Sequence, residues 1–202
     1  MKIAIVKYNA GNVQSVLYAL QRLGVNAVVT DDAEEIMKAD KVIFPGVGNA
    51  APAMEYLQKK NLDKLIISLT QPVLGICLGL QLMCNVSEEG NTNCLGIFDV
   101  KVKKFDSSAV KNNNASFKIP HMGWNNIYEL KSLLFNDVKE NSFVYFVHSY
   151  YAELSPETIA TTDYIIPYSA AMQHDNFYGV QFHSEKSADA GIQIISNFLK
   201  LV

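Results

Sequence analysis

The sequence predicts an α/β fold: an open sheet with a parallel core, a mixed or antiparallel extension, and helices on both faces. Two observations predict this class. In the first half of the chain, short β-rich runs alternate with stretches of helical periodicity, the order that produces parallel strands joined by crossover helices. After Asn85, strand-like runs follow one another with little helical periodicity, so antiparallel strands should extend the sheet.

The elements of the first half follow from local pattern. Strands are expected at KIAIVK, NAVVT, KVIF and PVLGI, and helices from Val13, over AEEIMK and over residues 53–69. In the first helix apolar residues recur at spacings of three and four, with Asn12 as a possible N-cap and Gly24 just past the end. This spacing predicts an amphipathic helix that covers the sheet.

The second half reads mainly as strands joined by turns. The strand-like runs are FDVKVKKF, SFVYFVHSYYAEL, TIATTDY, YSAAMQ and FYGVQFH. A last helix from about Ala188 should close the domain; its apolar face comprises Ile192, Ile195, Phe198, Leu199 and Val202. The polar, Asn-rich segment at 106–117 is expected to be an exposed loop.

Composition sets the limits of the functional reading. A chain of 202 residues, 49% of them hydrophobic, predicts one globular domain over residues 1–202. A net charge of -3 without any basic run gives no reason to expect a nucleic acid partner. The start of the chain has only four apolar residues between Lys2 and Lys7, too few for a signal-peptide core, and no later apolar run reaches the length of a membrane span. A cytoplasmic protein is therefore expected, without a membrane partner.

Three cysteines, Cys77, Cys84 and Cys94, lack C-x-x-C spacing and indicate neither a disulfide framework nor a metal site, and no cofactor is expected. Cys77 has a special setting, because Gly75-Ile76-Cys77-Leu78-Gly79 follows a strand and opens a helix. This is the setting of a nucleophile elbow, in which glycines permit the tight turn and the helix N-terminus favours a thiolate. The backbone N–H of Leu78 would then face an oxyanion. A small buried thiol at a strand end is the alternative reading.

A base for this nucleophile is available near the end of the chain. In FYGVQFHSEKS, the strand period places Gln181, His183 and Glu185 on one face. A carboxylate two residues from a histidine can fix its tautomer and stabilise its cation, as in a catalytic triad. A solvated strand end with two polar residues is the alternative.

A second glycine loop, Pro45-Gly46-Val47-Gly48, follows the strand KVIF. Because ligands of open α/β sheets bind at the carboxyl ends of strands, this loop should lie near Cys77 and offer a second oxyanion donor. An ordinary βα turn is the plainer interpretation, and the missing third glycine argues against a dinucleotide site.

Taken in order, PGVG, GICLGLQ and QFHSEKS resemble the class I glutamine amidotransferases along essentially the whole chain. The resemblance implies a flavodoxin-like sheet and a glutaminase with Cys77 as nucleophile, His183 as acid and base, and Glu185 as its partner. It places Leu78, Val47 and Gly48 at the oxyanion. It also implies contacts to the substrate, glutamine, from Gly46, Gln81, Glu89, His148, Ser149 and Tyr150.

Two further stretches, PHMGWN and YFVHSYY, resemble the branch of this family that serves histidine biosynthesis. There the glutaminase forms a heterodimer with a (βα)₈-barrel cyclase subunit, and ammonia passes from one to the other. The resemblance implies a partner surface that includes Asn12, Met122, Trp124, Asn125 and Lys186. A lone tryptophan such as Trp124 is otherwise most simply a packing residue.

The chain departs from the family pattern at two places. Ser184 stands where proline is usual between the histidine and the glutamate, and KYNAGN replaces the usual opening, with Asn12 as its matching polar residue. Three other readings stay open: a glutaminase subunit of a different amidotransferase, a cysteine amidase or peptidase that needs no partner, and a non-catalytic domain that retains the fold.

Overall fold

The computed structural model describes residues 1–8, 11–109 and 117–201. Among these, a seven-stranded sheet has the order β11-β12-β13-β4-β3-β1-β2. Its strands are Ile3–Val6 (β1), Ala27–Thr30 (β2), Lys41–Gly46 (β3), Val73–Cys77 (β4), Thr158–Tyr164 (β11), Ile166–His174 (β12) and Phe177–Val180 (β13). Strands β2, β1, β3, β4 and β13 pair in parallel, whereas β12 and β11 are antiparallel. The predicted parallel core with an antiparallel extension is confirmed.

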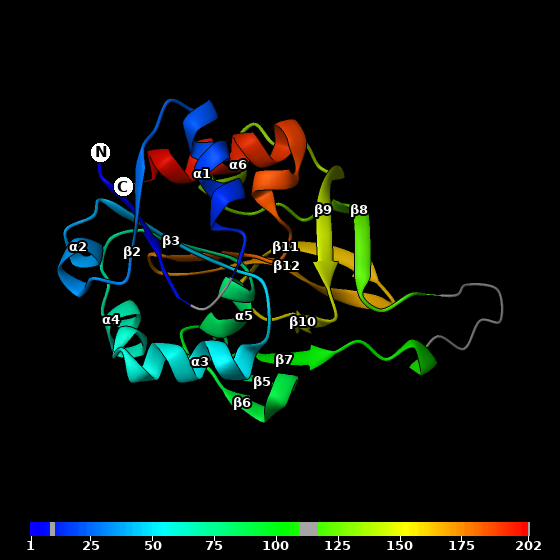
Figure 1. The fold of residues 1–202 in the computed structure, drawn as a ribbon. Helices are drawn as coiled ribbons and strands as arrows, with labels where there is room; N and C mark the ends of the chain where they lie inside the picture. Colours follow the sequence, from blue (N-terminus) through cyan, green and yellow to red (C-terminus); the bar gives the residue numbers. More distant parts are fainter. Residues whose placement is uncertain (9–10, 110–116, 202) are drawn as a thin grey trace.

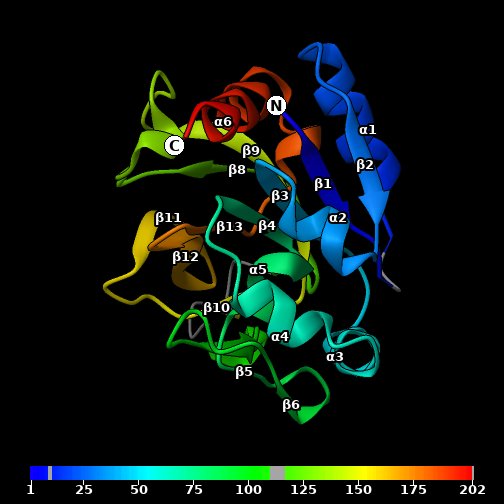
Figure 2. The same ribbon diagram turned by 90° about the vertical axis from the view of Figure 1, so that its left-hand side faces the viewer.

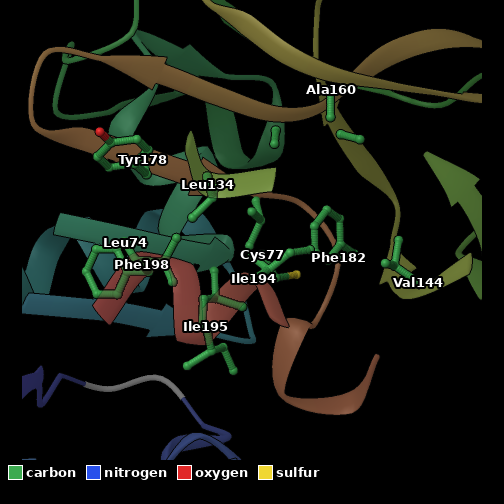
Figure 3. Close-up of a cluster of buried hydrophobic side chains, with 14 of the residues drawn as sticks. Leu74, Cys77, Leu134, Val144, Ala160, Tyr178, Phe182, Ile194, Ile195 and Phe198 are labelled. Carbon is green, nitrogen blue, oxygen red and sulfur yellow. The ribbon is translucent and has the colours of Figure 1, made fainter. Parts of the chain in front are cut away.

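Helices cover both faces of this sheet (Figures 1 and 2). One face carries Val13–Arg22 (α1) and Ala188–Lys200 (α6), and the other carries Ala33–Met37 (α2), Ala50–Lys59 (α3), Leu62–Ile67 (α4) and Leu78–Met83 (α5). Strand alternation explains the two layers: Ile3 and Ile5 pack with α1 and α6, while Ala4 and Val6 pack with α2 to α4. Figure 3 shows part of the first layer, with Leu74 of β4 against α6.

Two smaller sheets flank the main one. Tyr150–Ala152 (β10), Lys101–Lys104 (β7), Val86–Ser87 (β5) and Thr92–Asn93 (β6) form a sheet in that order, and His121–Ile127 (β8) pairs with Ser142–His148 (β9) as an antiparallel hairpin. Short 3₁₀ turns occupy Glu89–Asn91, Ser107–Ala109, Leu133–Phe135 and Ser184–Lys186. Strand β8 had no sequence signal of its own.

Two local predictions were wrong in detail, and a third, the N-cap at Asn12, is correct in position but lacks the side-chain hydrogen bond. The expected helix over 53–69 is two helices, because Asn61 adopts a left-handed conformation (φ 56°) that ends α3 before α4 begins. Asn12 also has a left-handed backbone (φ 73°), and its side chain makes no capping hydrogen bond to α1. The strand FYGVQFH ends at Val180, so His183 and Glu185 lie beyond the sheet edge.

The C-terminal end of α1 and the start of α6 lie where they were predicted. Gly24 lies just past α1 with φ 73° and donates its N–H to the carbonyl of Gln21. Helix α6 begins at Ala188 and buries Ile195 and Phe198, with Ile194 buried as well. Val202 and residues 110–116 of the expected loop lie outside the described residues. Across the three described ranges, none of the helices combines the length and the apolar character that crossing a membrane requires.

Candidate active site

Cys77 lies at the junction of β4 and α5, and its backbone is strained. Its φ of 54° and ψ of -105° are unusual for a residue with a side chain. A Cβ at Gly79 would lie 1.8 Å from the carbonyl oxygen of Phe44, and one at Gly75 would lie 2.9 Å from the carbonyl carbon of Gly79. The two glycines therefore allow α5 to approach the sheet closely, and the chain turns sharply at Cys77 between them.

The second glycine loop meets this junction through the register of the sheet. Gly46 pairs with Cys77 where β3 and β4 run in parallel. A Cβ at Gly46 would lie 2.1 Å from the hydroxyl of Tyr8, which donates to the carbonyl of Pro45 at 2.6 Å. Gly48 has a φ of 128°, a conformation that favours glycine. Gly46 is thus required for packing, and the loop beyond it starts beside the thiol.

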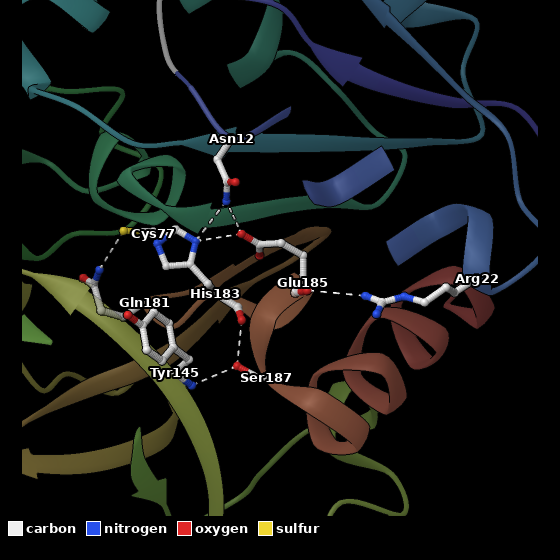
Figure 4. Close-up of polar contacts among 8 residues, drawn as sticks. All are labelled: Asn12, Arg22, Cys77, Tyr145, Gln181, His183, Glu185 and Ser187. Carbon is white, nitrogen blue, oxygen red and sulfur yellow. Dashed lines mark hydrogen bonds and ion pairs between the residues drawn. The ribbon is translucent and has the colours of Figure 1, made fainter. Parts of the chain in front are cut away.

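His183 and Glu185 form a buried pair next to Cys77 (Figure 4). The Nδ1–H of His183 donates to Oε1 of Glu185 at 2.7 Å, and the ring lies between the carboxylate and the sulfur. Burial favours the neutral imidazole, but the neighbouring Cys77 sulfur and Glu185 carboxylate outweigh it and raise the pKa of His183 to about 10. The imidazolium is therefore the favoured form of His183.

Asn12 joins this pair from the loop after β1. Its side-chain amide donates to Oε1 of Glu185 and lies 3.4 Å from Nδ1 of His183. Because that Nδ1 carries the hydrogen shared with Glu185, the amide hydrogen of Asn12 goes to the carboxylate. Asn12 is half-buried, and sequence reasoning, which assigned it to the partner surface, missed these two contacts.

The backbone of the pair is fixed by Ser187. Its hydroxyl donates to the carbonyl of His183 at 2.6 Å and accepts the backbone N–H of Tyr145 at 2.9 Å. The turn that carries His183 is thereby tied to β9 (Figure 4). Ser184, the departure from the family pattern, is buried, and its hydroxyl has no partner among the described residues.

Two glutamines lie on the other side of the sulfur. Nε2 of Gln81 donates to the carbonyl of Tyr150 at 2.8 Å and to Oε1 of Gln181 at 3.0 Å. Nε2 of Gln181 in turn donates to Sγ of Cys77 at 3.6 Å. The strand period had placed Gln181 on the face of His183, but no sequence signal indicated its contact with the thiol.

A pocket of about 350 Å³ opens at Cys77. The predicted oxyanion and glutamine residues line it, with the exception of Gly46, and two residues that the sequence did not indicate complete it. The lining residues are Val47, Gly48, Cys77, Leu78, Gln81, Glu89, Pro120, Val147, His148, Ser149 and Tyr150. The sheet register and the hairpin β8-β9 thus bring segments from the whole chain to one cavity, although the roles of these residues stay predictions.

Glu89 supplies a carboxylate to this pocket. Its Oε2 accepts the N–H of Ala50 at 2.7 Å, at the N-terminus of α3. Burial raises the pKa of Glu89, while the Ala50 N–H opposes the rise. With one oxygen held by the helix, the side chain is oriented before any ligand arrives.

His148 belongs to a neutral network behind the pocket wall. Its Nδ1–H donates to the carbonyl of Tyr150 at 2.7 Å, and its Nε2 lies 3.0 Å from the hydroxyl of Tyr168. That hydroxyl also lies 3.2 Å from Nδ1 of His121. Burial lowers the pKa of His148 to about 3 and that of His121 to about 4. Tyr168 therefore donates to His148 and accepts from His121.

The residues assigned to a partner surface lie outside the pocket. On β8, Met122 is 63% exposed and Trp124 is 51% exposed, and Lys186 is also exposed. Asn125 donates to the carbonyl of Asp163 at 2.7 Å.

Within the described part of the chain, no group of three or more His, Cys, Asp or Glu side chains is placed to hold a metal ion.

The fold and the site together are those of a thiol hydrolase built on an open α/β sheet, with an imidazole and a carboxylate aligned behind the sulfur. Residues 4–202 match the family model described as glutamine amidotransferase class-I. The chain therefore belongs to the class I glutamine amidotransferases, as the motifs predicted.

Within that family, full-length relatives are named imidazole glycerol phosphate synthase subunit HisH. The protein of Bacteroides fragilis is 59% identical over 201 residues, and that of Bacteroides thetaiotaomicron is 56% identical; each match covers 100% of both chains. The resemblance of PHMGWN and YFVHSYY to this branch is confirmed. A solved structure, a putative GMP synthase protein from Thermoplasma acidophilum, has a TM-score of 0.75 at 21% identity, and covers 99% of this chain and 92% of its own. It confirms the flavodoxin-like fold.

Proposed function

We propose that the chain is the glutaminase subunit of an imidazole glycerol phosphate synthase. It hydrolyses glutamine to glutamate and ammonia and passes the ammonia to a (βα)₈-barrel cyclase subunit, which makes imidazole glycerol phosphate and an aminoimidazole carboxamide ribotide in histidine biosynthesis. The observation that carries the proposal is the strained Cys77 at the pocket, next to the His183–Glu185 pair. The full-length relatives support the choice of synthase.

The reaction uses a thioester. The Cys77 thiolate attacks the side-chain carboxamide carbon of glutamine, and His183 gives its Nε2 proton to the nitrogen, which leaves as ammonia. A water molecule then gives a proton back to His183 and attacks the thioester, so that glutamate is released and the thiolate returns. Glu185 holds the ring in one tautomer through the 2.7 Å bond to Nδ1 and stabilises its charge.

The negative oxygen of each tetrahedral intermediate needs donors that are already in place. The N–H of Leu78 is free of helical bonding because Leu78 is the first residue of α5. The Val47-Gly48 peptide lies across the same pocket and can offer a second N–H. Donors fixed by a sheet register and a helix start cost little reorganisation during the reaction.

The rest of the pocket fits the α-amino-acid end of glutamine. The carboxylate of Glu89 pairs with the α-ammonium group, and the Ser149-Tyr150 segment lines the same pocket. Both amide hydrogens of Gln81 are already used by Tyr150 and Gln181, so Gln81 presents only its carbonyl oxygen to a substrate donor. This restriction favours a ligand with an N–H group at that place.

The partner surface lies on β8 and on the turn after β13. Met122 and Trp124 are exposed apolar residues of β8, and Lys186 is exposed on the turn after β13. Asn12 and Asn125 complete the predicted contacts. Ammonia released into water would be protonated, so its delivery needs a docked, shielded exit.

This heterodimer belongs in the cytoplasm, and residues 1–202 form one glutaminase domain. The free thiols of Cys77, Cys84 and Cys94 and the family match over residues 4–202 support these two points.

The test compares three glutaminase rates: that of the glutaminase chain by itself, that with the cyclase subunit, and that with the cyclase subunit plus its ribotide substrate. A large rise only in the last mixture is expected, together with its loss in Cys77→Ala. A rate that never responds to the cyclase would instead support a cysteine amidase that needs no partner. A wild-type rate in Cys77→Ala would exclude the thioester mechanism.

A further inference from the structure

A chain of two hydrogen bonds runs from Gln81 through Gln181 to the sulfur of Cys77. The amide of Gln81 lies 3.0 Å from the carbonyl oxygen of Gln181, and the amide nitrogen of Gln181 lies 3.6 Å from Sγ. Gln181 is fully buried, so bulk water cannot replace either bond. These two hydrogen bonds reach the sulfur without involving the His183–Glu185 pair.

The orientation of both amides follows from their partners. Gln81 faces two acceptors, the carbonyl of Tyr150 at 2.8 Å and the oxygen of Gln181, so its NH₂ group must lie between them. The oxygen of Gln181 is therefore committed to Gln81. Its NH₂ group has only one direction left, toward Cys77. Rotating the Gln181 amide by half a turn would set its nitrogen against the nitrogen of Gln81.

The backbone holds this contact firmly. Strand β13 pairs with β4 so that Val180 is opposite Ile76, and Gln181 and Cys77 leave the sheet side by side. The N–H of Gln181 donates to the carbonyl of Ala170 at 2.8 Å, which continues the pairing with β12 by one residue. A donor one residue past the end of a strand, with its own backbone N–H still bonded to the sheet, is better fixed than one in the middle of a loop.

We propose that Gln181 is a further catalytic residue, which donates a hydrogen bond to the Cys77 thiolate, and that Gln81 is the positioning residue that turns the Gln181 amide toward the sulfur. The proposal rests on Cys77 being the nucleophile of the proposed function. It assigns to Gln81 a role in the free enzyme, before glutamine binds.

The donor acts at two points of the reaction. It stabilises the thiolate before attack, and it stabilises the thiolate again when this leaves the second tetrahedral intermediate and the carbon–sulfur bond breaks. In the thioester the sulfur carries no charge, so the bond is weakest there. A neutral amide suits this task, because a second cation beside the sulfur would compete with the protonated His183.

The experiment measures the ionisation of Cys77 directly in the full-length chain. The rate at which iodoacetamide alkylates Cys77 is followed from pH 5 to 10 by mass spectrometry of the peptide that contains it, so that alkylation of Cys94 is counted separately. In Gln181→Met, which keeps the length and lacks the donor, the midpoint should rise by about 0.5 to 1 pH unit, or about three- to tenfold slower alkylation below the midpoint.

Gln81→Met is the second variant, and it keeps the proposal testable if Gln181→Met does not fold. It should shift the midpoint in the same direction by a smaller amount, because Gln181 is still present but no longer oriented. Gln173→Met is the matched control, since Gln173 bonds to Ser132 and Tyr178 and makes no hydrogen bond to the sulfur. It should leave the midpoint unchanged.

An unchanged alkylation profile in folded Gln181→Met or Gln81→Met would overturn the proposal, even if glutaminase activity fell. This outcome is distinct from failure of the proposed function, which would show as glutaminase activity in Cys77→Ala whatever the alkylation profile. A shifted midpoint in Gln181→Met together with a normal one in Gln173→Met supports the assignment.

Discussion

The side-chain amide of Asn12 donates a hydrogen bond to the carboxylate of Glu185, 173 residues further along the chain. The carboxylate thus has two donors on one oxygen, the amide and the Nδ1–H of His183. A carboxylate with both donors in place is fixed in direction. The loop after β1 therefore takes part in aligning the imidazole.

The first prediction concerns this contact. Asn12→Ala should lower kcat for glutamine hydrolysis by the complex by about ten- to a hundredfold, because a hydrogen bond to a buried charge contributes about 1.5 to 3 kcal/mol. KM should change little, since Asn12 does not line the pocket. Steady-state kinetics give both values. Gln14→Ala, at an exposed position two residues away, is the control; a higher KM with an unchanged kcat would contradict the prediction.

The second prediction concerns the strain at Cys77. With φ at 54°, glycine fits this position better than any residue with a Cβ, so Cys77→Gly should be about 1 kcal/mol more stable than Cys77→Ala. Urea unfolding of the two variants gives the difference. At Cys84, with an ordinary φ of -68°, the order should reverse, and glycine should be the less stable choice. A Cys77→Gly variant that is less stable than Cys77→Ala would show that Cys77 is not strained.

The third prediction concerns the pH dependence of stability. Burial lowers the pKa of His148 from 6.5 to about 3, so the unfolded chain binds a proton between these values and the folded chain does not. The free energy of unfolding should therefore fall as the pH falls below 6.5, by about 1 kcal/mol per pH unit from this residue. Urea unfolding at pH 7, 6 and 5 measures the slope. His148→Gln should reduce it, and an unchanged slope in the folded variant would contradict the prediction.

The fourth prediction concerns the hydroxyl of Tyr168. Tyr168→Phe leaves Nδ1 of His121 and Nε2 of His148 without a partner in a fully buried place, which should cost about 1 to 3 kcal/mol of stability. KM for glutamine should also rise, because His148 lines the pocket. Tyr178→Phe is the control, with one long hydroxyl contact of 3.3 Å to Gln173. Equal losses of stability in both variants would argue against the network.

The sequence predicted those features whose causes are local. Gly75 and Gly79 flank Cys77 because two backbones approach closely there, and this spacing is visible without a structure. Parallel strands with crossover helices followed from periodicity alone. The position of Gly46 beside Cys77 then follows from the sheet, since strand ends of a parallel sheet lie at one edge.

Other features depend on residues far apart in the chain. Asparagine is a residue type favoured at N-caps, but the side chain of Asn12 donates to Glu185 and makes no capping hydrogen bond to α1. The break at Asn61 depends on one left-handed residue inside an otherwise helical pattern. Gln181 was placed on the correct face, but its orientation depends on Gln81, which belongs to a different element, so periodicity could not indicate it.

The order of the strands also has a consequence during protein synthesis. Strand β4, which ends in Cys77, lies between β3 and β13. Strand β13 comprises residues 177–180, so it is synthesised about a hundred residues after β4. Gln181, which contacts the sulfur, and the His183–Glu185 pair come later still. A chain still on the ribosome therefore carries the Cys77 thiol while another 104 residues are added before Gln181, the first of these later residues, is present.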